Sequence, residues 1–121
     1  KGKMIYLVSP DVSAGSEPSP GQTMNCAGYI SPLATGVILD SSGSLSTAST
    51  GQYAEYFDPD GSAHVVDTRL HTKNSGSTES FVFPNVQVPF LYHQKFNYYN
   101  GGSLAASLIS GQLNITGWFE P

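Results

Sequence analysis

The sequence predicts an all-β fold, an antiparallel β-sandwich or jelly roll of seven to nine short strands with at most one short helix. Short runs rich in Val, Ile, Thr, Tyr and Phe recur along the 121 residues. Clusters of Gly, Pro, Ser, Asp and Asn separate these runs at intervals of about 8–12 residues, which is typical of sandwiches and barrels. The one segment with helical spacing, Ser103–Ile109, is short, and a strand explains it nearly as well.

The first 25 residues are predicted to contain a strand and a linker. The compact apolar run Lys3–Ser9 predicts a buried strand. Pro10–Asn25 carries three prolines among serines and glycines, so we expect no regular element there. A strand before such a linker resembles an arm, which either pairs within its own domain, the favoured interpretation, or crosses to a neighbouring subunit. An exchanged arm would consist of Met4, Ile5, Tyr6, Leu7 and Val8.

Residues 26–121 are predicted to form the body of a single domain that spans residues 1–121. Cys26–Ile30 and Ala34–Asp40 each predict a short strand, and a turn is expected at Ser41–Ser44. The clearest local structure is a hairpin within Gly51–Lys73, where two β-rich runs flank the turn residues Asp58-Pro59-Asp60-Gly61.

The C-terminal part of the chain predicts two further strand regions. Ser80–Asn100 reads as one or two strands, because Pro84 and Pro89 interrupt it and indicate edge positions, bulges or corners. Gln112–Phe119 alternates between two sets of side chains, as a half-buried terminal strand does.

The composition limits the classes of protein to which the chain can belong. Charged residues make up 12% of the chain, against about 25% in an ordinary soluble domain. The surface must therefore consist of neutral polar residues, which we associate with extracellular and virion surfaces and with surfaces that pack against copies of themselves. The net charge is -4 with five Lys and Arg residues, too few for the basic stripe that nucleic acids or anionic membranes require.

The single cysteine and the hydropathy pattern set two further bounds. Cys26 has no cysteine partner in the chain, so it cannot form an intrachain disulfide. A small buried apolar residue is favoured over a reactive thiol or an interchain bridge. No run of 18 apolar residues occurs, so we expect no membrane insertion.

Two patterns that suggest an enzyme are weak, and we expect no catalytic residues. Gly101–Ala105 resembles a nucleophile elbow, but no histidine or aspartate follows Ser103, as the hydrolases with that elbow require. A turn with a serine helix cap explains the segment better. Glu55, Asp58 and Asp67 would serve glycoside hydrolysis only if two of them met in a deep cleft, which so short a β chain seldom provides.

Two patterns that suggest a metal site are equally weak, and we expect no metal and no cofactor. His64, Asp67 and His71 lie close in sequence, but alternation along a strand places His64 on the opposite face from the other two. The cationic Arg69 between Asp67 and His71 would also repel a metal ion. Asp58–Gly61 matches only part of a calcium loop and is explained by the turn.

The stretch FLYHQKFNYYNGG, at positions 90–102, is the best candidate for a binding surface because aromatic residues with polar tips dominate interfaces and sugar-binding platforms. Strand parity assigns Phe90, Tyr92, Phe96 and Tyr98 to one face, expected to be core, and Leu91, His93, Lys95 and Tyr99 to the other. The candidate residues for an interface or ligand are Tyr92, His93, Lys95, Tyr98, Tyr99 and Trp118.

These observations favour a non-enzymatic structural protein on the surface of a particle or filament. In composition and architecture the chain resembles bacteriophage surface domains, which implies a capsid-decorating or tail-fibre role. We expect a homo-oligomer, with a trimer as the preferred stoichiometry, and a capsid or tail scaffold protein or a glycan as further partners. The alternatives are an extracellular carbohydrate-binding module, and a pilin-like subunit with an exchanged N-terminal strand.

Overall fold

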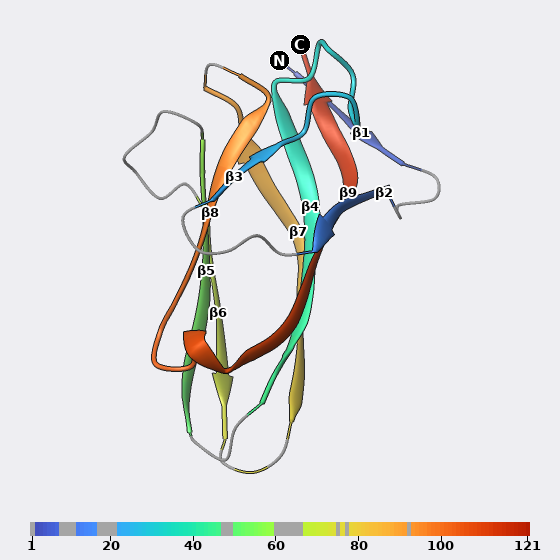
Figure 1. Cartoon of the computed structure of the whole chain (residues 1–121). Coiled ribbons are helices and arrows are strands. Elements are labelled where there is room, and N and C mark those ends of the chain that lie inside the picture. The colour runs from blue at the N-terminus through green and yellow to red at the C-terminus, as the bar shows by residue number, and fades with distance from the viewer. Residues whose placement is uncertain are drawn as a thin grey trace.

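The computed structural model describes residues 2–7, 12–16, 22–46, 50–59, 67–74, 76, 78–91 and 93–121 (Figure 1). These residues contain nine strands and one short 3-10 helix, η1, at Ala105–Ser107. The strands are β1 (Lys3–Tyr6), β2 (Val12–Ser16), β3 (Gln22–Asn25), β4 (Gly36–Leu45), β5 (Gly51–Pro59), β6 (Asp67–Lys73), β7 (Glu79–Pro89), β8 (Lys95–Gly101) and β9 (Leu108–Glu120). The all-β prediction is therefore confirmed.

The strands form two antiparallel sheets that pack as a sandwich. Sheet A has the order β1-β9-β4-β7, and β2 also pairs with β9. Sheet B has the order β3-β8-β5-β6. β1 and β2 lie along the same edge of β9, β1 against residues 117–120 and β2 against residues 112–115. Figure 1 shows the two chain ends side by side at one end of the sandwich.

The pairing is nested about the middle of the chain. β5 pairs with β6, β4 with β7, β3 with β8, and β2 with β9, every pair antiparallel. The chain therefore runs outward from a central hairpin, and each successive pair closes a longer loop. Sheets A and B receive alternate pairs, so from β2 to β9 consecutive strands lie in opposite sheets, except for the central hairpin β5–β6 within sheet B.

The core lies between the inner faces of the two sheets. Alternation along β5 and β8 turns Tyr53, Phe57, Phe96 and Tyr98 inward, and all four side chains are fully buried. The ring of Phe57 lies 5.9 Å from that of Phe96 and 5.6 Å from that of Tyr98, within the range of favourable aromatic pairs. Sheet A contributes Val37, Leu39, Leu45, Phe81, Phe83, Val86, Val88, Leu113 and Ile115.

The N-terminal predictions need correction. The strand expected at Lys3–Ser9 exists as β1, but it is an edge strand and not a buried one, with Met4 40% and Tyr6 57% exposed. Ile5 is half-buried, Leu7 packs against the core, and Val8 lies outside the described residues.

The linker expected at Pro10–Asn25 was also wrong in part, because β2 and β3 both fall within it. Their sequences carry little strand signal, and the backbones of β9 and β8 supply the hydrogen-bond partners that hold them. Tertiary pairing thus overrides a composition that is typical of a loop.

Two predictions just after the linker were wrong for related reasons. Cys26–Ile30 is a turn closed by a bridge from Ala27 to Ile30, not a strand. Ser41–Ser44 lies inside β4 and not in a turn, because β4 runs between β9 and β7 and both neighbours pair with it. Gly43 fits there since a side chain would meet the ring of Phe81 at 2.8 Å.

The remaining predictions hold more closely. β5 and β6 pair as the predicted hairpin. Its turn was predicted to begin too early, because Asp58 and Pro59 belong to β5 and pair with β8, and residues 60–66 lie outside the described part. Ser80–Asn100 contains two strands, β7 and β8. Pro84 lies beside the irregularity where Asn85, at φ 58°, donates its N–H to Asp40 Oδ1 at 3.0 Å, and Pro89 ends β7. Ser103–Ile109 combines η1 with the start of β9.

Candidate functional site

The candidate site lies at one end of the sandwich, where two connections between the sheets meet. Residues 26–35 link β3 to β4, and residues 90–94 link β7 to β8; we call this region the loop end. Gln94 ties the two connections together, because its Nε2 donates to Ser31 O at 2.8 Å and to Ala34 O at 3.3 Å. In return, Cys26 N–H donates to Gln94 O at 2.8 Å. The loops therefore form one hydrogen-bonded unit.

Sheet A anchors this unit. Thr35 N–H donates to Phe119 O at 2.7 Å, and Phe90 N–H donates to Thr35 O at 2.9 Å. Within the first loop, Leu33 N–H donates to the Ser31 hydroxyl at 3.1 Å, a local bond that favours a turn. Because the backbone groups at these points are paired within the chain, the loops need no ligand to hold their shape.

A pocket of about 280 Å³ opens between the two loops. One part of its lining is apolar and comes from both connections, while the rest carries an imidazole, an amide and a hydroxyl. The lining residues are Pro32, Ala34, Thr35, Phe90, Leu91, His93 and Gln94. None of them carries a permanent charge. The volume lies just below the usual range for drug-sized ligands, so the pocket suits a group about the size of a single ring.

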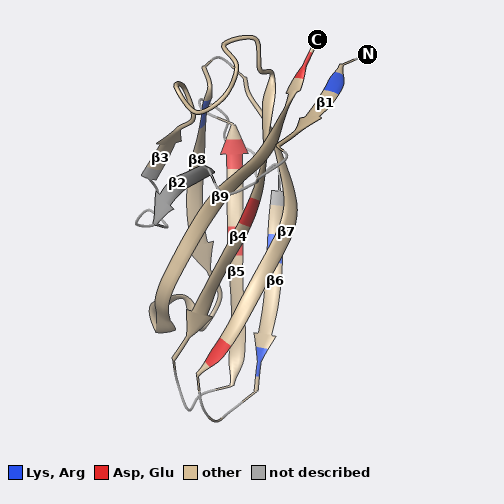
Figure 2. Cartoon of the chain, turned by 90° about the vertical axis from the view of Figure 1, so that its right-hand side faces the viewer, with Lys and Arg blue, Asp and Glu red and all other residues tan. Residues whose placement is uncertain are grey.

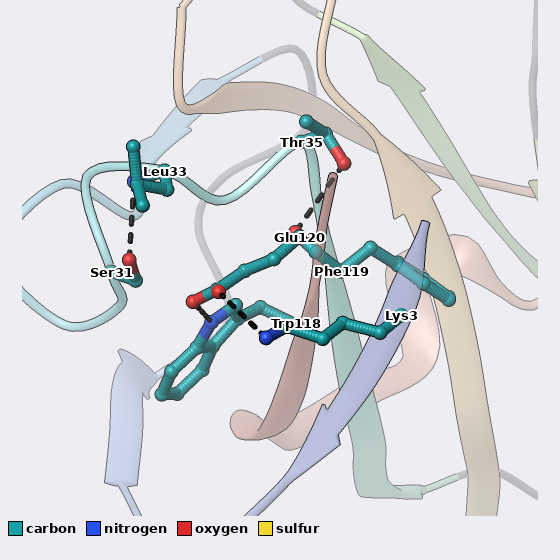
Figure 3. A network of polar contacts seen from close by, with 7 residues as sticks. All are labelled: Lys3, Ser31, Leu33, Thr35, Trp118, Phe119 and Glu120. Carbon is teal, nitrogen blue, oxygen red and sulfur yellow. Dashed lines mark hydrogen bonds and ion pairs between the residues drawn. The ribbon is translucent and has the colours of Figure 1, made fainter. Parts of the chain in front are cut away.

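A polar cluster closes the neighbouring corner of the loop end (Figure 3). Trp118 Nε1 donates to Glu120 Oε2 at 2.8 Å, and Lys3 Nζ lies 4.0 Å from Glu120 Oε1. The Trp118 indole N–H holds the pKa of Glu120 below its usual range, with lesser contributions from the Ser31 hydroxyl and the Lys3 charge. The cluster thus joins β1 to β9 beside the first loop.

The structure separates the residues of the aromatic stretch into different environments. His93 is exposed and lines the pocket, while Leu91 lines it and is 51% exposed. Lys95 and Tyr99 lie on the outer side of β8, with Tyr99 39% exposed. Tyr92 lies outside the described residues. Trp118 is half-buried against the core and its N–H is engaged by Glu120.

Tyr98 is a correction to the predicted site. It is fully buried, and its hydroxyl bonds Glu55 and Tyr53 inside the sandwich, so it cannot contact a surface ligand. Strand parity had already assigned it to the core face, and that part of the prediction is confirmed. Phe90, Leu91 and His93 lie in a connection and not in a strand, yet their burial agrees with the assignment, since Phe90 packs against the core and the other two are exposed.

The sequence did not point to the pocket residues of the first loop, which are Pro32, Ala34 and Thr35. They lie in the stretch interpreted as a link between two strands. Their relation to His93 arises from contacts such as Gln94 to Ser31, which spans 63 positions. The signal in the sequence was the turn-forming dipeptide Ser31-Pro32, which indicates a loop but not which other loop lies against it.

A second polar cluster is buried in the middle of the sandwich. The Glu55 carboxylate accepts hydrogen bonds from Ser41 Oγ at 2.5 Å, Tyr53 OH at 2.7 Å and Tyr98 OH at 2.8 Å. Ser41 belongs to sheet A and Glu55 to sheet B, so this network joins the two layers. Glu55 is 0% exposed. The network is therefore structural, since no substrate reaches it.

The same geometry removes the paired-carboxylate hypothesis for Glu55 and Asp58. Three positions separate them on β5, so strand alternation turns their side chains to opposite faces. A glycosidase pair must flank one substrate bond. Asp67 pairs with Phe57 through its backbone, and its side chain lies outside the described part.

The other motifs prove structural where the structure describes them. The elbow-like segment is a tight turn, since Gly102 takes φ +85°. The serine helix cap expected there was wrong, because the N-cap of η1 is Leu104 and Ser103 Oγ instead accepts the N–H of Gln52 at 3.2 Å. His71 Nε2 lies 2.5 Å from Glu79 Oε1, a contact between β6 at the edge of sheet B and β7 at the edge of sheet A. His64 is outside the described residues. Among those described, no three His, Cys, Asp or Glu side chains gather closely enough to hold a metal ion.

Cys26 is buried at the base of the first loop. Its side chain is 1% exposed, and burial raises the pKa of its thiol to about 12. The thiol therefore stays protonated and unreactive at neutral pH, since the thiolate is the nucleophile. This confirms the interpretation of Cys26 as a small buried residue.

No protein-family model matches this chain, and no curated protein sequence matches it. In the residues that the structure describes, no helix has the length and apolar character needed to cross a bilayer.

Proposed function

We propose that this chain is a non-enzymatic β domain on the surface of a particle or filament, of the capsid-decorating or tail-fibre kind in viruses, and that it assembles by contacts with copies of itself. The observation that carries the proposal is β1. This four-residue edge strand pairs with β9 alone and leaves Met4 and Tyr6 exposed. An edge strand presents backbone N–H and C=O groups that can pair with another copy, and a terminal strand can exchange into one.

The strand order supports the same proposal. We infer that the nested pairing, with β2·β9, β3·β8, β4·β7 and β5·β6 divided between two sheets, is that of a jelly roll. Jelly rolls occur in viral capsid proteins and in lectins. This is an argument from fold, and fold alone does not determine function.

The outer face of sheet A offers a surface for such contacts. The register places Met4, Phe119 and Gly36 in one cross-strand row and Tyr6, Gly117 and Ile38 in the next. Gly36 and Gly117 have no side chain that projects from these rows, and a side chain at Gly36 would lie 3.2 Å from the Phe119 ring. Charged residues are sparse on the strands of this sheet (Figure 2). Ile38 is buried, so Met4, Tyr6 and the half-buried Phe119 make up the exposed apolar surface, and a weakly charged surface of this kind favours protein contacts.

The mass of the full chain in solution, measured by light scattering across a concentration series, tests the proposal. We expect an oligomer, with a trimer as the preferred stoichiometry. The double variant Met4→Ser, Tyr6→Ser should shift the population toward monomer. Val82→Ser is the matched control, because Val82 is 63% exposed on β7 of the same sheet but far along the strand from β1. A chain that stays monomeric at every concentration would overturn the proposal.

Deletion of residues 1–7 tests whether β1 crosses to another subunit or stabilises its own domain. If β1 crosses between subunits, the deletion should weaken assembly and leave the remaining domain folded. If the deletion instead lowers the stability of the monomer by several kcal/mol, of the order of losing a buried element, β1 belongs to its own core and does not exchange.

A further inference from the structure

The pocket at the loop end has the chemistry of a carbohydrate site. We infer that it binds one uncharged pyranose ring, either as a free sugar or as a terminal residue of a glycan. The inference does not depend on self-association, because every described lining residue belongs to one chain.

The first argument is that the pocket lining has an apolar part and a polar part. Phe90, Leu91 and Pro32 supply an apolar wall, and His93, Gln94 and Thr35 supply polar atoms. A pyranose ring has the matching division, with C–H groups on its faces and hydroxyls around its rim. Aromatic and apolar side chains bind such faces, while a few placed polar groups fix orientation.

The second argument is that polar groups remain for a ligand. Gln94 uses its Nε2 to bind Ser31 and Ala34, so its orientation is fixed and its Oε1 faces no hydrogen-bond donor among the described residues. The His93 imidazole likewise takes part in no hydrogen bond within that part of the chain, and it is exposed. An amide oxygen accepts a hydrogen bond from a hydroxyl group, and a neutral imidazole can donate to one and accept from another.

The third argument concerns charge and excludes other small ligands. Among the described residues, no Lys, Arg, Asp or Glu lines the pocket, so no side chain there compensates the charge of a phosphate, a carboxylate or an ammonium group. A purely apolar ligand would shield Gln94 Oε1 and the His93 imidazole from water without offering them hydrogen bonds. A neutral ring with hydroxyls satisfies both conditions.

The experiment uses the full chain with ¹⁵N labelling and a panel of methyl glycosides of glucose, galactose, mannose and N-acetylglucosamine. We expect at least one of them to shift the amide resonances of Thr35, Leu91 and Gln94, with a dissociation constant in the millimolar range. Leu91→Ala and His93→Ala should each weaken binding about tenfold or more. Both side chains are exposed, so the variants should fold.

Matched controls locate the site. Leu33→Ala removes a leucine of the same loop end that is 66% exposed and is not among the lining residues, and Tyr99→Ala removes an aromatic residue on the outer side of β8. Neither should change affinity. Binding that Tyr99→Ala abolishes and Leu91→Ala spares would place the sugar on β8 and overturn the assignment.

Two further probes test the ligand class. N-acetylneuraminic acid tests a charged sugar, and cyclohexanol tests a ring of similar size without the pattern of hydroxyls. If either binds as tightly as the best methyl glycoside, the inference of a neutral saccharide is wrong. The absence of shifts at tens of millimolar glycoside would also overturn it. A monomeric protein that still binds the glycosides would contradict only the proposed assembly.

Discussion

The middle of the sandwich and its loop end both concentrate polar groups, but they use them in opposite ways. In the middle, three hydroxyls converge on the Glu55 carboxylate and water is excluded. At the loop end, bonds such as Gln94 to Ser31 fix the backbone, while His93 and Leu91 stay exposed. The difference shows that polarity alone does not mark a functional site. What matters is whether the polar groups are already satisfied inside the fold.

The largest expected effect comes from Glu55→Ala. The change leaves Ser41, Tyr53 and Tyr98 without their shared acceptor and opens a cavity between the sheets. We expect a loss of at least about 3 kcal/mol in the free energy of unfolding, measured by urea denaturation. Glu55→Gln retains one acceptor oxygen and should cost less. Equal stability of Glu55→Ala and the wild type would show that the middle is not held by this network.

A smaller effect is expected from Tyr98→Phe, which removes one of the three donors and keeps the ring. The expected loss is about 1–2 kcal/mol in the same denaturation experiment. Tyr99→Phe is the neighbouring control, since Tyr99 is exposed on the outer side of the sheet and should change stability by less than about 0.5 kcal/mol. If both variants lose the same amount, the contrast between the buried and the exposed tyrosine fails.

Acid should act on the corner of the loop end through Glu120. The pKa of its carboxyl is lowered in the folded state, mainly by the Trp118 N–H. The contribution to stability is therefore present above the unfolded pKa of about 4.3 and is lost as the pH falls through the lower folded value. Glu120→Gln should make the melting temperature fall less steeply with pH in that acid range. An unchanged slope would argue against the Trp118–Glu120 bond.

The smallest effects are expected for Leu33→Ser and Leu91→Ser. Both side chains are more than half exposed, so each change should alter the free energy of unfolding by less than about 0.5 kcal/mol. Thermal denaturation of the two variants beside the wild type measures this. A large loss for either one would mean that the loop end is part of the core and not a free surface.

Most of the fold could be predicted from the sequence, because several strands have a composition that marks them as strands. The regions of β5, β6 and β9 are rich in β-branched and aromatic residues, and strands were predicted in all three. Their bounds differ, since β5 continues through Asp58 and Pro59 and β9 begins at Leu108 and not at Gln112. β2, β3 and the Ser41–Ser44 part of β4 carry no such signal. They are strands because β9, β8 and β7 lie beside them, and pairing of this kind is not written in the local composition.

The candidate site was accessible from sequence only in part. Aromatic content pointed to residues 90–102 and included His93, but it also included Tyr98, whose hydroxyl serves the core. Parity distinguished these residues along β8, and in the loop before it the described Phe90, Leu91 and His93 also have the burial that parity assigned to them. The other wall of the pocket comes from residues 32–35, and only the folded chain brings it to His93.

The nested pairing has a consequence for how the chain folds. Phe57 pairs with Asp67 across the central hairpin, whereas Val12 pairs with Ile115 near the two ends of the chain. Closing a longer loop costs more entropy, so the central hairpin is expected to form first and the β9 edge last. Folding should accordingly be slow, on the order of milliseconds to seconds. In the native state we expect the strands to open in the reverse order, so β1 should open at the lowest cost in free energy. Its opening would expose the edge of β9 at residues 117–120 while the rest of the sandwich stays intact.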